Sequence, residues 1–306
     1  HADLDNDGWQ DVYVAGDYGS DRLFLNRRDG RFRDCTEEAM GLDTRKGMNV
    51  DVGDYNRDGW LDIYVTNITD EYMKECNMLW HNTGGTGEEI AFIDLARETG
   101  TCDTDWGWAA KFADFDNDGW EDLFVVNGLR SAGPENYIPI LLKTTIIRPG
   151  VDFSDLESYA DIGELTWSGY QKQRLFHNLG GTFKEIGAEA GVDTNLDGRG
   201  IGVGDFDNDG LLDFYQSNAR QPSLFFHGVT QNAGSWVAIK LVGRESNRNG
   251  IGARVIVRAG AEGEPAETWL REVNGGNGYS SQSSFRLHFG LGRAQRVESV
   301  EIRWPG

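Results

Sequence analysis

Short runs in which apolar residues follow one another or alternate with polar ones recur along the first three quarters of the chain. They are Val12-Tyr13-Val14, Ile63-Tyr64-Val65, Leu123-Phe124-Val125 and Phe214-Tyr215. β-branched and aromatic residues in such short runs favour β-strands. The last three runs also have an apolar run before them, such as residues 200–204, with an acidic segment in between. Each acidic segment is therefore predicted to join the two strands of a β-hairpin.

The acidic segments share one nine-residue pattern. They occupy residues 3–11, 54–62, 114–122 and 205–213, named loops 1 to 4 here. Positions one, three, five and nine are Asp in every loop except at Asn56, and position six is always Gly. The glycine allows a sharp turn, so the alternate side chains point at one spot. Carboxylates this close repel one another, and a hard cation with oxygen ligands is their predicted occupant.

The pattern favours calcium over the other possibilities. A helical calcium hand needs a bidentate Glu at position twelve, where this chain has Val14, Val65, Val125 and Gln216. Magnesium is the weaker candidate because it retains its waters, and a solvated acidic turn is the remaining alternative. The predicted calcium ligands are the side chains at positions one, three, five and nine and the backbone carbonyl at position seven. In full they are Asp3, Asp5, Asp7, Trp9, Asp11, Asp54, Asn56, Asp58, Trp60, Asp62, Asp114, Asp116, Asp118, Trp120, Asp122, Asp205, Asp207, Asp209, Leu211 and Asp213.

The spacing of the loops predicts a repeat. They start at residues 3, 54, 114 and 205, which indicates a unit of about fifty residues, the size of a four-stranded propeller blade. The long third interval indicates an insertion at about residues 129–171, which we expect to pack on its own propeller rather than on a partner. Four repeats would leave sheet edges open. We therefore expect an incomplete propeller, whose earlier blades are missing from this sequence or supplied by another chain.

The pattern changes after Ser235. Strands are predicted at residues 236–242, 253–258, 268–273, 285–289 and 297–304, which indicates a small all-β, sandwich-like module. The charge changes as well, from 43 acids and 19 bases in residues 1–234 to 7 acids and 10 bases in residues 235–306. The predicted domains are a propeller over residues 1–228 and the module over residues 229–306.

Charge and cysteine content narrow the setting. A net charge of -21 argues against nucleic acid and anionic membrane surfaces as partners. No run is long and apolar enough for a transmembrane segment. Three cysteines leave at least one free thiol. Cys76 with Cys102 is the preferred pair because these residues flank one repeat, and three buried thiols, with Cys35 the third, are the alternative.

The loops and their flanking strands resemble FG-GAP/VCBS repeats, the calcium-bearing blades of integrin-α-type propellers. The C-terminal motifs SNRNGIGARV (246–255), GYSSQ (278–282), HFGLG (288–292) and IRWPG (302–306) resemble the ASPIC/UnbV domain. Together they are similar to the cartilage acidic protein family and its bacterial relatives. The resemblance implies bound Ca²⁺, about four ions here, and an extracellular, cell-surface or periplasmic location. Animal members are linked to extracellular matrix. Asn56 departs from the pattern and should weaken its site.

The predicted function is adhesion or binding of an extracellular protein or glycan, with structural Ca²⁺. Further copies or other chains in a surface assembly are the other candidate partners. The alternatives are a glycan-active enzyme and a structural subunit of an extracellular assembly or filament. The sequence lacks GxSxG, zinc and phosphate-loop motifs, so we expect no enzyme activity. His81 and His177 occupy one place in their repeats and are predicted to be structural. Arg248, Arg254 and Arg271 are expected to stabilise the Gly-rich turns of the module rather than to form an anion site.

Overall fold

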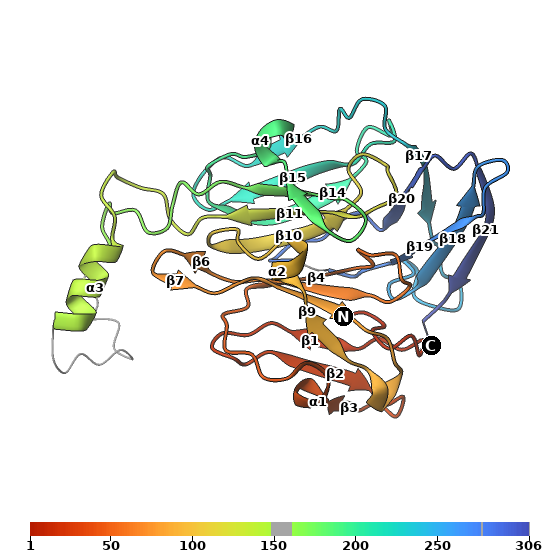
Figure 1. Cartoon of the computed structure of the whole chain (residues 1–306), viewed down its shortest axis with the longest axis horizontal. Helices are drawn as coiled ribbons and strands as arrows, with labels where there is room; N and C mark the ends of the chain where they lie inside the picture. Colours follow the sequence, from red (N-terminus) through yellow and green to blue (C-terminus); the bar gives the residue numbers. More distant parts are fainter. Residues whose placement is uncertain (148–160, 277, 306) are drawn as a thin grey trace.

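Four antiparallel sheets, the blades, stand side by side in chain order (Figure 1). The computed structural model describes residues 1–147, 161–276 and 278–305, without the side chains of residues 144–147. Blade 1 contains β1 (Val12–Val14), β2 (Arg22–Asn26) and β3 (Phe32–Asp34). Blade 2 contains β4 (Asn49–Gly53), β5 (Asp62–Thr66), β8 (Met78–Asn82) and β9 (Phe92–Asp94). Blade 3 contains β10 (Gly107–Ala113), β11 (Asp122–Asn127), β12 (Arg174–Asn178) and β13 (Phe183–Glu185). Blade 4 contains β14 (Gly198–Gly204), β15 (Asp213–Asn218) and β16 (Leu224–Phe226).

Short elements fill the connections between these strands. They are α1 (Thr36–Met40), β6 (Thr69–Asp70), β7 (Met73–Lys74), η1 (Gly87–Glu89), α2 (Ala96–Thr99) and α4 (Gly187–Ala190). Along each blade every strand pairs with the next blade strand in the chain, and all these pairs are antiparallel. The predicted all-β fold class is confirmed. Among the described residues the sheets do not close into a ring, which agrees with an incomplete propeller or a sandwich.

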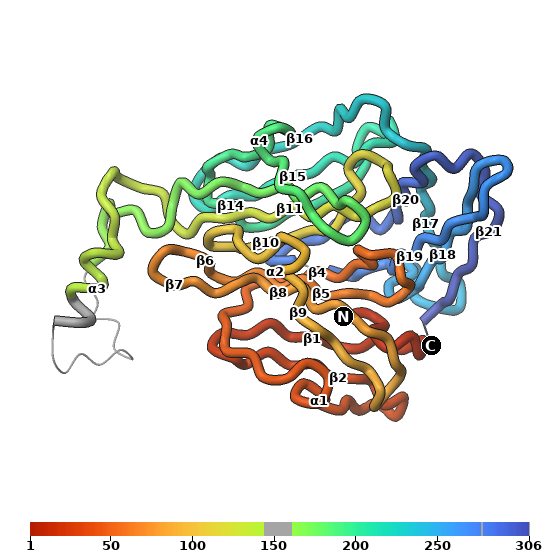
Figure 2. The backbone as a smooth tube through the Cα atoms, viewed as in Figure 1, coloured from red at the N-terminus to blue at the C-terminus, as the bar shows by residue number. Residues whose placement is uncertain are grey.

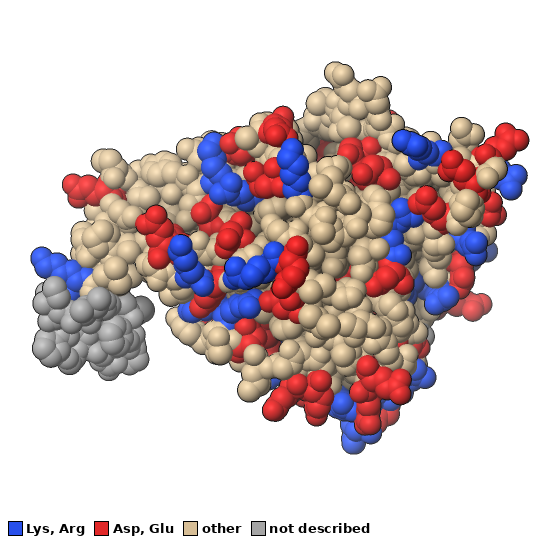
Figure 3. Space-filling model, in the orientation of Figure 1, with Lys and Arg blue, Asp and Glu red and all other residues tan. Residues whose placement is uncertain are grey.

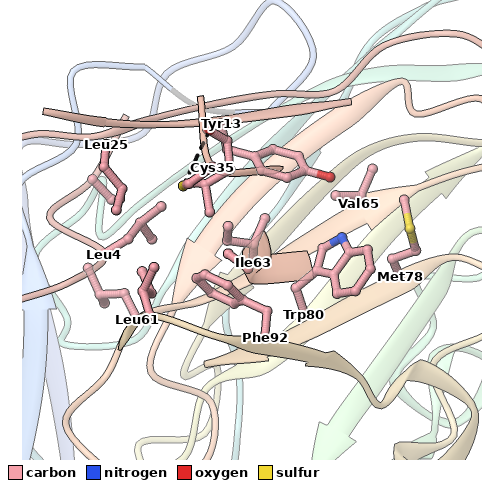
Figure 4. Close-up of a cluster of buried hydrophobic side chains, with 14 of the residues drawn as sticks. Leu4, Tyr13, Leu25, Cys35, Leu61, Ile63, Val65, Met78, Trp80 and Phe92 are labelled. Atoms are coloured by element: carbon pink, nitrogen blue, oxygen red, sulfur yellow. Dashed lines mark hydrogen bonds between the residues drawn. The ribbon is translucent and has the colours of Figure 1, made fainter. Parts of the chain in front are cut away.

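The core lies between the blades because their central strands are buried on both faces. Ile63 and Val65 of β5 pack against blade 1, in the cluster that Figure 4 shows. Tyr64 lies between them in the sequence and packs toward blade 3 instead. Successive side chains of a strand point to opposite faces, so one apolar run serves two interfaces. In β11, Val125 packs toward blade 2 and Phe124 toward blade 4 in the same way.

The C-terminal module has two sheets around its own core. One pairs β17 (Ser235–Lys240) with β20 (Arg286–Gly292), and the other has the order β19 (Glu267–Glu272), β18 (Arg254–Gly260), β21 (Arg296–Arg303). All five strands overlap the predicted ones. The backbone trace places the module along one end of the stacked blades (Figure 2). The predicted domain boundary falls in the connection between β16 and β17.

The insertion rests on blade 3 through its base. Arg130 forms backbone bridges to Trp167, and the Trp167 ring packs edge-on against Trp106 at 5.9 Å. Helix α3 (Ile138–Ile147) extends away from the sheets (Figure 1). The sequence did not predict this helix, although proline is tolerated in a first helical turn, where Pro139 lies. Residues 148–160 of the insertion lie outside the described residues.

Other sequence expectations can be compared with the structure directly. Cys76 and Cys102 form a disulfide, as preferred, and Cys35 is a buried free thiol. Acidic and basic side chains are interspersed over the face seen in Figure 3. Among the residues that the structure describes, no helix has the length and apolar character needed to cross a membrane.

Candidate metal loops and their neighbours

Each loop lies at a hairpin tip, as the sequence predicts. The registers Gly53↔Asp62, Ala113↔Asp122 and Gly204↔Asp213 place position nine directly across from the residue that precedes position one. In loop 1 an isolated bridge between Ala2 and Asp11 takes the place of the first strand. The hairpin therefore brings the first and ninth positions of every loop together.

The backbone of the loops is folded so that their own carboxylates gather. Position four has a left-handed backbone in all four loops, with φ between 58° and 62° at Asn6, Arg57, Asn117 and Asn208. In loop 3 the N–H groups of Asp118 and Gly119 donate to the carboxylate of Asp114, at 3.1 and 2.9 Å. Loops 1 and 2 repeat both bonds. The turn thus fixes the carboxylate of position one at the centre of the loop.

Three of the four loops bring at least three carboxylates within 4.8 Å of one another. These groups are Asp3, Asp5, Asp11; Asp114, Asp116, Asp118; and Asp205, Asp207, Asp213. Loop 2 contributes no such group within the described part of the chain, because the Asn56 amide replaces one carboxylate and donates to Asp58 Oδ2 at 2.8 Å. Asp7 pairs with Arg28 at 2.8 Å. The carbonyl ligands at position seven stay a prediction.

Burial makes these carboxylates costly without a counter-charge. Burial raises the pKa of Asp54 to about 8, and the negative charges of Asp62 and Glu121 raise it further. Burial also raises the pKa of Asp62, to about 7. Among the described residues, Asp62 Oδ2 and both carboxylate oxygens of Asp205 are buried without a hydrogen-bond partner. Buried polar atoms normally have partners. Oxygen atoms that converge without donors fit a hard divalent cation.

A histidine lies beside three of the loops, which the sequence only partly anticipated. His81, His177 and His227 each place Nδ1 near Oδ1 of the position-nine aspartate, at 3.3, 3.0 and 2.9 Å. Asp122 raises the pKa of His177 to about 9 by accepting its hydrogen bond. All three histidines thus reach a loop carboxylate, and His177 and His227 also belong to groups of side chains that could hold a metal ion. The structural role expected for His81 and His177 stays a prediction.

A recurring asparagine connects loops 1, 2 and 3 to their surroundings, and Gly228 takes its place at loop 4. Asn82 and Asn178 donate their backbone N–H to the position-nine aspartate, at 2.8 and 2.9 Å. Their side-chain amides donate to carbonyls of two loops, those of Leu4 and Leu61 for Asn82 and those of Tyr55 and Glu121 for Asn178. The asparagine lies 15, 20 and 56 residues after the ends of loops 1, 2 and 3, so no fixed spacing in the sequence reveals its role.

Neighbouring loops are also joined directly. Asn6 of loop 1 donates to the carbonyl of Gly59 in loop 2 at 3.2 Å, and Asn117 of loop 3 donates to that of Gly210 in loop 4 at 2.9 Å. Loop 2 has Arg57 at this position. Its guanidinium lies over the rings of Trp120 and Trp269, at 4.8 and 4.5 Å from their centroids.

Two of the three arginines that the sequence singled out contact the propeller. Arg254 Nη1 lies 3.2 Å from Asp3 Oδ2, and Arg271 Nε lies 3.0 Å from Glu121 Oε1. The expectation that these side chains stabilise turns within the module is wrong for both. Sequence reasoning missed the contacts because they join residues that lie 150 positions or more apart in the chain.

Comparison with known proteins agrees with this architecture. The FG-GAP-like repeat family matches residues 3–65 and 163–215, and the ASPIC and UnbV family matches residues 243–306. Loop 3 lies outside the matched ranges but has the same geometry as loops 1 and 2.

Cartilage acidic protein 1 of Mus musculus is 29% identical over 99% of this chain and 50% of its own length. The Xenopus tropicalis and Homo sapiens proteins of that name are 27% and 28% identical, over 98% and 96% of this chain and 40% and 38% of theirs. The chain thus spans at most half the length of these relatives. It belongs to the family that joins FG-GAP-like repeats to an ASPIC/UnbV domain, and it is homologous to cartilage acidic protein 1.

Proposed function

We propose that this chain is a calcium-binding β-propeller that acts outside the cytoplasm as a binding protein, without catalytic activity of its own. The observation that carries the calcium assignment is the convergence of carboxylate oxygens in loops 1, 3 and 4, together with the unpartnered oxygens of Asp205. Calcium accepts six to eight oxygen ligands in flexible geometry, as backbone carbonyls and water can add here. Magnesium needs a near-octahedral shell and is less suited.

Calorimetric titration of the chelator-treated protein tests the calcium assignment. We expect three tighter sites and one weaker site at loop 2, since Asn56 supplies less negative charge than Asp. Asn56→Asp should strengthen the weak site, and Asp116→Asn should weaken the site in loop 3. Asp29→Asn, an exposed acid outside the loops, is the matched control. Binding that is equal in all variants would reject the loops as the calcium sites.

The binding role is supported by what the fold leaves accessible. The module contacts loops at one end of the propeller, whereas the insertion and α3 project from elsewhere on it (Figure 1). Tyr170 on the insertion is 50% exposed. We therefore assign ligand binding to the insertion, with an extracellular protein or a glycan as the ligand.

Binding to panels of matrix proteins and glycans, in calcium and in chelator, tests this assignment. Leu142→Asp places a charge on α3, where the side chain is 41% exposed, and Val14→Asp places one on β1 of blade 1, at a comparable 45%. We expect only Leu142→Asp to reduce binding. Equal loss in both variants would exclude the insertion as the binding surface.

A further inference from the structure

The module touches all four loops, and in loops 2, 3 and 4 it contacts residues that are not the predicted side-chain ligands. Glu267 pairs with Arg57 at 2.6 Å, His288 Nε2 lies 2.6 Å from Asn117 Oδ1, and Arg286 donates to Asn208 at 2.7 Å. Each of these loop residues is position four, between the third and fifth positions that carry ligands. Arg254 also donates to Asn6, position four of loop 1, so the module contacts the same left-handed turn in all four loops.

Loops 3 and 4 are also contacted at their glycines. Trp269 donates its indole N–H to the carbonyl of Gly119 at 3.1 Å. Trp236 lies against Gly210 so closely that a Cβ atom there would be 2.1 Å from its ring. In loops 1 and 2 the glycines at position six are Gly8 and Gly59, and a Cβ atom added to either would have no neighbour within 4 Å. In loops 3 and 4 the glycine thus allows the sharp turn and also leaves room for a tryptophan of the module to pack against the loop.

Strand β20 lies directly over loop 3. The N–H of Gly292 donates to the carbonyl of Asn117 at 2.9 Å. A Cβ atom at Gly290 would lie 1.9 Å from Asp114 Oδ2, the carboxylate of position one. The backbone of the module is thus in contact with both the turn and the predicted ligand. A change in the spacing of the loop 3 carboxylates would displace the surface on which β20 rests.

We propose that the closed, cation-bound conformation of loops 3 and 4 is the docking surface of the C-terminal module, so that loss of the cations releases the β17–β20 sheet from the propeller. The proposal rests on the calcium binding proposed above. A cation draws positions one, three, five and nine together and so fixes positions four and six, which the module contacts. Without a counter-charge the carboxylates repel one another, and the contact residues move with them.

Loop 1 provides an internal contrast. There Arg254 pairs with Asp3, itself a predicted ligand, and also donates to the side chain of Asn6. The guanidinium supplies positive charge to this loop whether or not a cation binds. The contact of β18 with the propeller should therefore depend least on calcium, and the contacts of β17 and β20 should depend on it most.

Docking and cation binding must strengthen each other by the same factor, because the coupling of two equilibria is reciprocal. Removing module contacts should then weaken calcium binding at loop 4 although no ligand is changed. The double variant Arg286→Ala, Trp236→Ala removes the contacts of the module with Asn208 and Gly210 in loop 4, and both side chains are partly exposed. Arg296→Ala, on exposed β21, is the matched control.

Hydrogen–deuterium exchange of the full chain in calcium and in chelator, with calorimetry on the same samples, tests the proposal. In chelator we expect exchange in β17 and β20 to be about tenfold faster, with a smaller change in β18. Asp209→Asn should produce the same change in calcium, and Asp29→Asn should not. The double variant should bind calcium at loop 4 about fivefold more weakly than Arg296→Ala does.

The outcomes separate this proposal from the proposed function. If calcium binds but β17 and β20 exchange equally in calcium and in chelator, docking does not depend on the cation and the proposal is overturned, while calcium binding stands. Unchanged calcium affinity in the double variant overturns it as well. If no calcium binds, both the proposal and the calcium assignment fail.

Discussion

Asn178 of blade 3 donates its side-chain amide to the carbonyl of Tyr55 in loop 2, at 2.8 Å, and so joins one blade to the loop of the preceding one. The same amide donates to the carbonyl of Glu121 at 2.8 Å. Asn178 is 1% exposed, so its amide is shielded from bulk solvent. One side chain therefore satisfies two carbonyls at the boundary between two blades.

Replacing Asn178 by Ala should destabilise the protein by roughly 2–4 kcal/mol, because two acceptors lose their donor at a buried site. Asn26 is the matched control. Its amide donates only to the carbonyl of Gln10, at 3.1 Å, within its own blade and at a less buried site. Urea unfolding of Asn178→Ala and Asn26→Ala would measure both effects. A loss for Asn26→Ala as large as that for Asn178→Ala would contradict the bridging role.

Calcium should raise the thermal stability of the protein. An ion that binds only the folded chain adds about 2.7 kcal/mol per site at a concentration one hundred times Kd. Scanning calorimetry in millimolar calcium, in magnesium and in chelator would show the largest rise in calcium. Superimposable curves in all three solutions would contradict a stabilising role for the ion.

His288 should make stability depend on pH in mildly acidic solution. Burial lowers its pKa to about 4, and Arg271 and Arg286 add to the effect. In the unfolded chain a histidine has a pKa of about 6.5. Between these values the unfolded chain binds more protons, so the stabilising contribution is present above about pH 6.5 and is lost as pH falls toward about 4. In calcium, unfolding free energies of His288→Gln should vary less over this range, and an unchanged profile would contradict the assignment.

The disulfide Cys76–Cys102 should stabilise the protein by about 3–4 kcal/mol, because it links cysteines 26 residues apart and so restricts the unfolded chain. Replacing both cysteines by serine and measuring urea unfolding tests this. Cys35 is the internal check: it is 1% exposed, and burial raises its thiol pKa to about 11. It should therefore react with a thiol reagent only after unfolding. Rapid reaction in the native protein would contradict its burial.

Local sequence patterns predicted the blades, the module strands and the hairpin position of the loops. Strand propensity and the nine-residue acidic pattern both act within a few residues, so Ile63-Tyr64-Val65 could be placed from neighbouring positions alone. The pattern did not reveal that Tyr64 packs toward blade 3 while Ile63 packs toward blade 1. Burial of both faces depends on blades that are distant in the sequence.

The contacts between module and loops could not be predicted for the same reason. Arg271 and Glu121 meet only because the module folds back over the loops, and neither residue carries a recognisable motif. The failure to predict helix α3 has a different cause, since its residues are apolar without a clear helical period and a proline lies in its first turn, at Pro139. The composition of the loops predicts a bound cation, whereas the module residues that contact the loops are set by the tertiary fold.

The bonds between neighbouring loops bear on the order in which ions would fill them. Asn6 joins loop 1 to loop 2 and Asn117 joins loop 3 to loop 4, whereas Arg57 interrupts the series in the middle. Within each pair, an ion in one loop should therefore raise the affinity of its neighbour, so that the weaker site of loop 2 should fill more readily once loop 1 is occupied. The chain would then behave as two ion-binding halves, with Arg57 and the two tryptophan rings at the boundary between them.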